Sequence, residues 1–152
     1  MTNPLATALT PVAILSRTRF FGQLTAKQLE RVAALSEWQQ YAEGQKVYRI
    51  GEPAAAVYVL VQGMVSLTIN FGDRNASAGD IVRRGELFGW AALTPNCNLR
   101  IATASCLTSC SLLAVDGTGL VGLMEQDHTV GYRLMTQLSQ LISGTLTAFA
   151  GG

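Results

Sequence analysis

The pattern of apolar and polar positions changes twice along the chain. Apolar side chains first recur at helical spacing, at Leu24, Leu29, Val32, Ala33 and Leu35. Thr25 lies where the N-cap of such a helix belongs, and Phe20 and Phe21 just before it are expected to pack that helix against the rest of the protein. The pattern therefore predicts an N-terminal helical part over residues 16–37.

From Trp38 onward, short strand-like runs alternate with glycine-containing turns. The runs are Gln45–Tyr48, Val57–Val61, Val65–Ile69, Asp80–Val82 and the long stretch Leu99–Val115. Residues 70–79 are polar and rich in turn formers, which predicts a hairpin region there. Regularly spaced short strands with turn signals are typical of a sandwich or barrel. We therefore expect a mainly β fold over residues 38–115, of the double-stranded β-helix or jelly-roll type, with flanking helices.

After Val115 the helical spacing returns. Asp116 and Gly117 begin a short segment, and a longer helix follows, with an apolar side made by Tyr132, Leu134, Met135, Leu138, Leu141, Ile142, Leu146 and Phe149. Two interpretations of this side stay open: packing against the helix's own domain, or a heptad-like seam that forms a homodimer. We expect C-terminal helices over residues 116–150.

Length and composition favour one compact domain over residues 1–152. A chain of 152 residues that is 49% hydrophobic can bury a real core and does not resemble a disordered segment. The formal net charge is only +1, and the basic pair Arg83 and Arg84 is too short for a phosphate-binding surface. We therefore expect this chain by itself to bind no nucleic acid.

Neither a membrane nor an oxidising compartment is indicated. The longest apolar run, Ala54–Val61, is far shorter than the ~20 residues that span a bilayer. Residues 1–16 carry no early basic residue and no clear cleavage site, so we expect no signal peptide. The three cysteines, Cys97, Cys106 and Cys110, are an odd set without a CxxC spacing. They favour buried thiols in a reducing, cytoplasmic setting.

Catalysis and metal binding find little support. His128, with Asp127 beside it, stands near the start of the long helix, where a surface or capping role is the ordinary one. The cysteines and the histidine form no familiar ligand spacing, and the Gly-x-Ser-x-Gly motif of hydrolases is absent from the sequence. We predict no enzyme, no metal site and no cofactor.

The informative segment runs from Gly85 to Arg100. Its first part, GELFGWAAL, contains a glycine turn whose free backbone amides can approach an anion closely. Arg100 follows about ten residues later and is expected on the next strand, where its planar fork can clamp the same anion. Phosphate is the obvious candidate for that anion.

These residues resemble the phosphate-binding cassette of cyclic nucleotide-binding domains, such as those of the catabolite activator protein family and of protein kinase A regulatory subunits. The family pattern is Gly-x-x-Phe-Gly-Glu-x-x-Leu, followed by Arg-Ser/Thr-Ala. The resemblance extends from about Ser16 to about Ala148 and includes Tyr41-x-x-Gly44, Gly51-Glu52 and the run from Val57 to Val65. It implies the same β-roll and a C-terminal dimerisation helix.

Carried over residue by residue, the resemblance gives a candidate ligand site of Gly89, Trp90, Ala91, Arg100, Ile101 and Thr145. Gly89 keeps the turn that faces the phosphate, and Arg100 keeps the phosphate-binding arginine. Trp90 replaces the glutamate that holds the ribose 2′-hydroxyl, and Ile101 replaces a hydroxyl-bearing residue. Loss of these two contacts weakens ribose-phosphate binding by roughly a hundredfold or more. Three alternatives then stay open for Arg100: it finds another partner, for which Glu86 is one candidate, it is solvated, or a different anionic ligand occupies the site.

The resemblance implies a regulatory module that binds a small anionic effector, cyclic AMP, cyclic GMP or a substitute, and signals through the C-terminal helix. The alternative is a degenerate member that binds no nucleotide and serves as an interaction or dimerisation domain. In such a member the ligand site is apolar and filled by side chains. Transcription regulators of this family bind DNA through a helix-turn-helix after the long helix; no such motif is expected within these 152 residues, so we do not expect this chain by itself to bind DNA in that manner.

Overall fold

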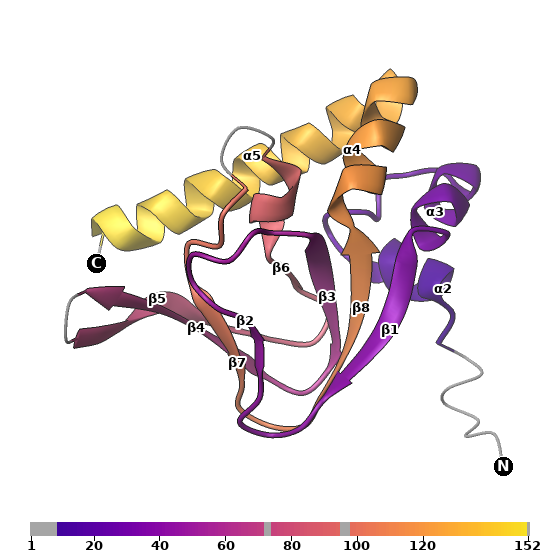
Figure 1. Cartoon of the computed structure of the whole chain (residues 1–152). Helices are drawn as coiled ribbons and strands as arrows, with labels where there is room; N and C mark the ends of the chain where they lie inside the picture. The colour runs from indigo at the N-terminus through magenta and orange to yellow at the C-terminus, as the bar shows by residue number, and fades with distance from the viewer. Residues whose placement is uncertain (1–8, 72–73, 95–97, 152) are drawn as a thin grey trace, which may run out of the picture.

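The computed structural model describes residues 9–71, 74–94 and 98–151. Its elements, drawn in Figure 1, are α2 (Pro11–Arg17), α3 (Ala26–Ala33), β1 (Ser36–Tyr41), β2 (Lys46–Tyr48), β3 (Ala56–Gln62), β4 (Val65–Phe71), β5 (Arg74–Val82), β6 (Leu87–Phe88), the 3₁₀ helix η1 (Trp90–Leu93), β7 (Thr103–Cys106), β8 (Cys110–Asp116), α4 (Gly117–Gln126) and α5 (His128–Gly151).

The described strands form two four-stranded antiparallel sheets, in the orders β1-β8-β3-β6 and β2-β7-β4-β5. In Figure 1 the two sheets curl around a common interior, α2 and α3 lie beside β1, and α4 and α5 lie over one end. This is the β-roll with flanking helices that the strand pattern predicts.

Strand β3 explains why this part of the sequence is apolar almost without interruption. Val57 and Val59 point into a core shared with the helices, whereas Tyr58 and Leu60 point into a second core between the sheets. Successive side chains of a strand alternate between its faces, so a strand covered on both faces needs apolar residues at every position. The same holds for β8, the partner of β3.

The predicted N-terminal helical part, residues 16–37, contains one described helix, α3, and the end of α2. Thr25 caps α3 as expected, and it forms a reciprocal capping box with Gln28. Phe20 and Phe21 are buried in the core. The sequence analysis missed α2, although its start carries a clear signal: the Thr10 side chain caps the helix, and Pro11 takes the first helical position.

The hairpin predicted over residues 70–79 is confirmed: β4 extends to Phe71 and pairs with β5, which begins at Arg74. The strand prediction that follows it needs correction. The stretch from Leu99 to Val115 is divided into β7 and β8, which belong to different sheets. Arg100 precedes β7 rather than lying within a strand.

The apolar side of α5 faces its own domain along its first half. Val130, Leu134 and Leu138 are buried in the core beneath the helices. The heptad-like seam through residues 134 and 138 is therefore already covered within one chain. Tyr132 and Met135 lie on the exposed side of the helix.

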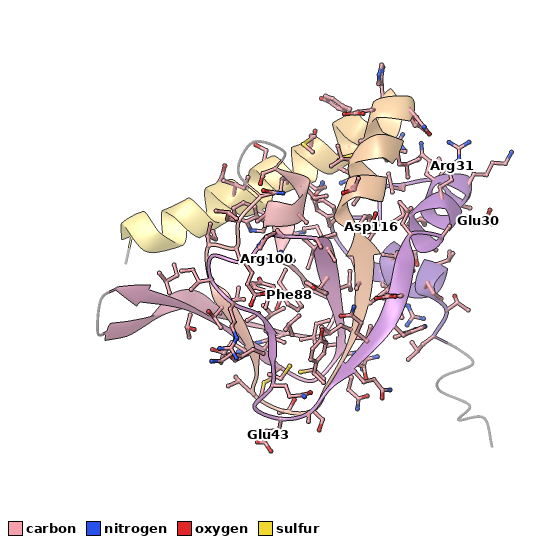
Figure 2. The ribbon with its side chains drawn as sticks, in the orientation of Figure 1. Glu30, Arg31, Glu43, Phe88, Arg100 and Asp116 are labelled. Carbon is pink, nitrogen blue, oxygen red and sulfur yellow. The ribbon has the colours of Figure 1, made fainter. Side chains whose placement is uncertain are left out.

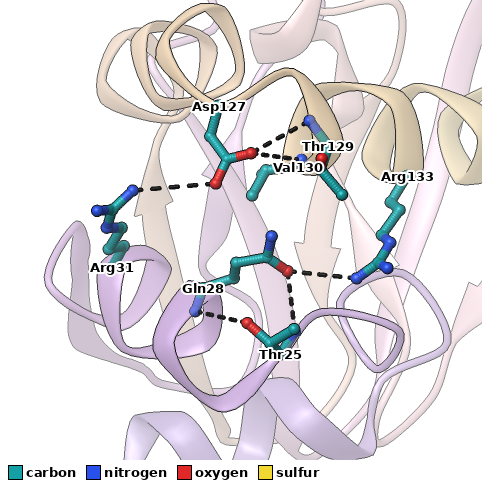
Figure 3. A network of polar contacts seen from close by, with 7 residues as sticks. All are labelled: Thr25, Gln28, Arg31, Asp127, Thr129, Val130 and Arg133. Atoms are coloured by element: carbon teal, nitrogen blue, oxygen red, sulfur yellow. Dashed lines mark hydrogen bonds and ion pairs between the residues drawn. The ribbon is translucent and has the colours of Figure 1, made fainter.

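The start of α5 is tied to α3 by polar contacts (Figure 3). The Asp127 carboxylate accepts hydrogen bonds from the backbone amides of Thr129 and Val130 and pairs with Arg31 at 3.9 Å. Arg133 Nη1 donates to the carbonyl of Gln23 at 3.1 Å and to Oε1 of Gln28 at 3.4 Å. The first turns of α5 are thus anchored at several points.

Candidate functional site

The segment from Gly85 to Leu93 forms a turn, a short strand and a 3₁₀ helix. Strand β6 pairs with β3, with Phe88 opposite Tyr58. Gly89 then adopts a left-handed conformation, with φ 79°, and begins η1. The first amides of a helix have no partner within it, so the amides of Trp90 and Ala91 are free for an acceptor outside η1.

Gly89 is required for two physical reasons. Its positive φ disfavours any residue with a Cβ. A Cβ built there would lie 2.9 Å from Arg100 Nη1 and 3.0 Å from Cδ2 of Tyr58. The glycine therefore lets the arginine and the aromatic ring approach the backbone.

Arg100 lies in the interior, with 4% of its surface exposed. Its Nη1 donates to the carbonyl of Gly89 at 2.8 Å, and its Nη2 donates to the carbonyl of Ala56 at 2.7 Å. Its backbone forms two further bonds, to the carbonyl of Glu52 and from the amide of Gly51, each at 2.8 Å. Figure 2 shows Arg100 and Phe88 inside the roll of strands, beneath η1.

Aromatic rings surround the guanidinium. Its central carbon lies 4.1 Å from the centroid of the Tyr48 ring and 5.5 Å from that of Tyr58. Tyr58 in turn stacks against Phe88, with centroids 5.2 Å apart. A desolvated cation over a ring face gains about 2 kcal/mol. Carbonyls and rings together hold a charge that would otherwise be costly to bury.

The electrostatics of the site reflect this enclosure. Burial lowers the pKa of Arg100, and the neighbouring tyrosines oppose that shift. Burial also raises the pKa of Tyr48 to about 12, against the opposing charge of Arg100. Within the described residues Arg100 forms no salt bridge, and its Nε has no hydrogen-bond partner. Arg100 is thus held without an ion pair to any described residue, although the carboxylate of Glu52 acts on it as a nearby opposite charge.

Glu86, the candidate partner for Arg100, does not pair with it. Its Oε1 accepts a hydrogen bond from the backbone amide of Arg83 at 2.7 Å. This carboxylate therefore stabilises the turn before β6 and forms no ion pair with the arginine.

A cavity of about 260 Å³ opens next to Arg100. We call it the cradle. Most of its lining is apolar, and its residues come from β2, β4, β5, the segment from Glu86 to Ala91, the segment from Arg100 to Ala102, and α5. Leu141 of α5 forms part of its wall. Its volume is slightly below the usual range of small-molecule sites, roughly 300–1,000 Å³.

The structure brings most of the predicted site residues together. The residues that border the cradle are Gly89, Trp90, Ala91, Arg100 and Ile101. Thr145 lies within α5, but its side chain is outside the described residues.

The two residues that depart from the family pattern leave the cradle open. Trp90 is half-buried and packs against the core beneath the helices, while still bordering the cavity. Ile101 borders it too, with 48% of its surface exposed. The cradle is apolar, as the degenerate alternative requires, but it is not filled.

Tyr48 and Leu141 are functional candidates that the sequence analysis did not find. Tyr48 packs on Arg100, and Leu141 covers the cradle. No short motif marks either residue, because each lies far along the chain from the segment it contacts. The apolar side of α5 included Leu141, and this was its only signal.

The histidine and the described cysteines, the other candidates for catalysis or metal binding, lie outside the cradle. His128 is exposed at the first position of α5. Cys106 and Cys110 are buried free thiols, and Cys97 lies outside the described residues. Over the described ranges, histidine, cysteine and acidic residues form no group that could hold a metal ion. No helix in the same ranges is both long and apolar enough to cross a membrane.

Comparison with known proteins identifies the family. The family model for the cyclic nucleotide-binding domain matches residues 38–127. The chain is 27% identical over 134 residues to a protein named as a potassium channel from Rhodopseudomonas palustris. That match covers 87% of this chain but only 30% of the relative, so the chain spans less than a third of its length.

Two solved structures share the fold. One is the catabolite activator protein of Thermus thermophilus, with a TM-score of 0.72, 20% identity, and coverage of 86% of this chain and 61% of that one. The other is the regulatory domain of Toxoplasma gondii protein kinase A with cyclic AMP, with a TM-score of 0.73, 20% identity, and coverage of 86% and 49%. With the β-roll, the glycine turn and the buried arginine, the family match leads to one conclusion: the chain belongs to the cyclic nucleotide-binding domain family.

Proposed function

We propose that this chain is a regulatory domain that binds a small anionic effector in the cradle, with a cyclic nucleotide as the first candidate. The anion would lie between the free amides at the start of η1 and the guanidinium of Arg100. No catalytic step is proposed, because the family is one of regulatory ligand-binding domains.

The observation that carries this proposal is the guanidinium of Arg100, which forms no ion pair with any described residue, at the wall of an open cavity. Carbonyl oxygens and ring faces lower the cost of its burial, yet its Nε keeps an unused donor. Because Nε is itself enclosed, an anion in the cradle would reach the guanidinium by replacing the carbonyl partner of Nη1 or Nη2, and the charge-assisted hydrogen bond so formed is worth about 1.5–3 kcal/mol.

Helix α5 is the element that would report occupancy. Its start is anchored by Asp127 and Arg133, whereas Leu141 farther along borders the cradle. An effector that contacts Leu141 favours those positions of the helix that keep this contact. Such an effector shifts the equilibrium between two positions of α5 only by the difference between its affinities for them.

The experiment is a thermal-shift titration with cyclic AMP and cyclic GMP up to millimolar concentration. We expect a saturable rise in Tm for the unmodified chain and for Arg84→Ala, which removes an exposed arginine outside the cradle. Arg100→Ala should abolish the rise. If neither nucleotide shifts the Tm, the effector is not a cyclic nucleotide.

A fluorescence measurement places the ligand. The chain has two tryptophans, so Trp38→Phe leaves Trp90 as the only one. Since Trp90 borders the cradle, ligand binding there should change its emission with the same midpoint as the thermal shift. A thermal shift without any change in Trp90 emission would place the nucleotide elsewhere.

The second candidate function is a degenerate domain that binds no nucleotide and serves in protein interaction. It is favoured by Trp90 at the place of the ribose-binding glutamate, and by the carbonyls of Gly89 and Ala56, which already accept from Arg100. This function predicts no change in Tm with any cyclic nucleotide.

A homodimer through α5 is part of either proposal. Since Leu134 and Leu138 are buried within one chain, the contact would use the side that carries Tyr132 and Met135. Tyr132 is 76% exposed, and a charge there should not disturb the core. Sedimentation of Tyr132→Glu as a monomer beside an unmodified dimer would support this contact. An unmodified chain that sediments as a monomer would contradict it.

A further inference from the structure

A second cavity of about 230 Å³ lies next to the cradle. Three segments form it: Thr18–Phe20 after α2, Gly85–Leu87 before β6, and Gln137–Leu141 of α5. Glu86, Leu87 and Leu141 border both cavities. The two cavities thus share three lining residues.

Gln137 is the unusual residue of this cavity. Four polar or charged residues are buried in the described part of the chain: Thr18, Arg100, Thr103 and Gln137. The first three have hydrogen-bond partners for their side chains. Gln137, with 6% of its surface exposed, forms no side-chain hydrogen bond to any described residue. A buried amide without a partner costs free energy on folding, by about 1–3 kcal/mol.

The amide of Gln137 is not fully enclosed. Among the described residues, Nε of Arg100 is a side-chain atom that is fully enclosed and lacks a hydrogen-bond partner. The oxygen and nitrogen of the Gln137 amide are not in this state. The amide therefore keeps its small remaining exposure. Since Gln137 lines the second cavity, a molecule there would meet the unused amide.

Arg19 supplies a charge at the same cavity. Its side chain is exposed and forms no salt bridge within the part of the chain that the structure describes. Glu86, on the opposite segment, adds a carboxylate. A ligand that fits both charges carries one anionic group for Arg19 and one N–H or ammonium donor toward Glu86.

The amide and the volume narrow the ligand further. A glutamine amide presents an adjacent donor and acceptor on one planar edge, and its complement is a second carboxamide or the edge of a nucleobase. At about 230 Å³ the cavity is below the usual range for drug-sized ligands, which suits a molecule of amino-acid size, and a carboxylate beside an ammonium group is the charge pattern of a free amino acid.

We propose that this second cavity is a ligand site for a free amino acid with a carboxamide side chain, recognised by Gln137 through its amide and by Arg19 through its carboxylate. Because Leu141 and Glu86 border both cavities, occupancy here also changes the affinity of the cradle, and the effect is reciprocal. Binding itself does not depend on the function proposed for the cradle.

The test is an NMR titration of the side-chain amide of Gln137, assigned by its disappearance in Gln137→Leu. L-Glutamine and L-asparagine should shift this resonance with saturation at millimolar concentration. Arg19→Ala should weaken binding at least tenfold. Arg84→Ala, which removes an exposed arginine that borders neither cavity, should leave it unchanged. The titration contains no nucleotide, so that failure of the cradle proposal and failure of this one are separable.

A control separates a ligand-binding amide from a structural one. If the amide is kept for a ligand, Gln137→Leu should leave the Tm unchanged or raise it, since an unpartnered buried amide is replaced by an apolar side chain of similar size. A lowered Tm would show that Gln137 stabilises the fold. That result, the absence of a shift with both amino acids, or a shift with 5′-AMP alone would overturn the proposal.

Discussion

Arg100 places its guanidinium carbon 4.1 Å from the centroid of the Tyr48 ring, in the core between the two sheets. This contact joins a residue just before β7 to the last residue of β2. It keeps the planar fork of the arginine in one orientation, with two nitrogens on carbonyls and Nε free. The ring is therefore a positioning element for the charge that the proposed effector would meet.

A comparison of Tyr48→Leu with Tyr48→Phe should measure how much the Tyr48 ring under Arg100 contributes to stability. Loss of the face under the guanidinium should destabilise the fold by about 2 kcal/mol more than Tyr48→Phe does, because phenylalanine keeps the ring. Urea unfolding of the two variants measures the difference. Equal stabilities would show that the ring contributes only apolar area.

The raised pKa of Tyr48 makes stability depend on pH in the alkaline range. Its folded-state pKa of about 12 lies above the ordinary value of 10.0, so the folded chain keeps a proton that the unfolded chain releases. The stabilisation is complete below about pH 10 and is lost as the pH rises to about 12, by roughly 2–3 kcal/mol in total. Unfolding free energies across this range should fall less steeply for Tyr48→Phe. Identical slopes would contradict the assignment to Tyr48.

Gly89→Ala and Gly85→Ala form a matched pair. Both glycines have positive φ, 79° and 86°, so alanine at either position costs about 1–2 kcal/mol of backbone strain. A Cβ at Gly85 meets nothing within 4 Å, whereas one at Gly89 meets Arg100 Nη1 at 2.9 Å. Gly89→Ala should cost a further 1.5–3 kcal/mol or so, because the bond from Arg100 to the Gly89 carbonyl must break. Chemical denaturation of both variants tests this difference.

Trp90→Glu tests the missing ribose contact. If cyclic AMP binds the cradle, a carboxylate at this position should strengthen binding by about tenfold to a hundredfold through the 2′-hydroxyl. Calorimetry with 2′-deoxy cyclic AMP is the control, since that ligand cannot form the new bond. An equal gain for both ligands would mean that removal of the indole, and not the new hydrogen bond, is responsible.

The buried thiols should be unreactive in the folded state. Burial and a hydrogen bond with Cys110 raise the pKa of Cys106 to about 12, and the thiolate is the reactive form. In a Cys97→Ser background, iodoacetamide at neutral pH should modify Cys106 and Cys110 only as fast as the chain unfolds. Rapid modification of the native chain would show that the β7–β8 turn opens locally.

The family could be predicted from the sequence because its signals are local. A glycine turn, an arginine a fixed distance later and alternating strands all depend on neighbouring residues. Gly89 has the positive φ that its place in the cassette requires, and Thr25 caps α3 as its spacing indicates. The sequence predicted a hairpin at residues 70–79 but not how far its strands extend. Polar residues with turn propensity form strands when a neighbouring strand supplies the hydrogen bonds.

By itself, then, the sequence determined the β-roll, the flanking helices and the position of the buried cation, because backbone conformation and strand alternation are set over a few residues. Only the tertiary structure decided what surrounds that cation: Tyr48 beneath Arg100, Leu141 over the cradle and Trp90 against the core. It also left Gln137 without a partner at a second cavity. Such contacts join residues far apart in the chain, and they depend on how the sheets and α5 pack, which no local pattern encodes.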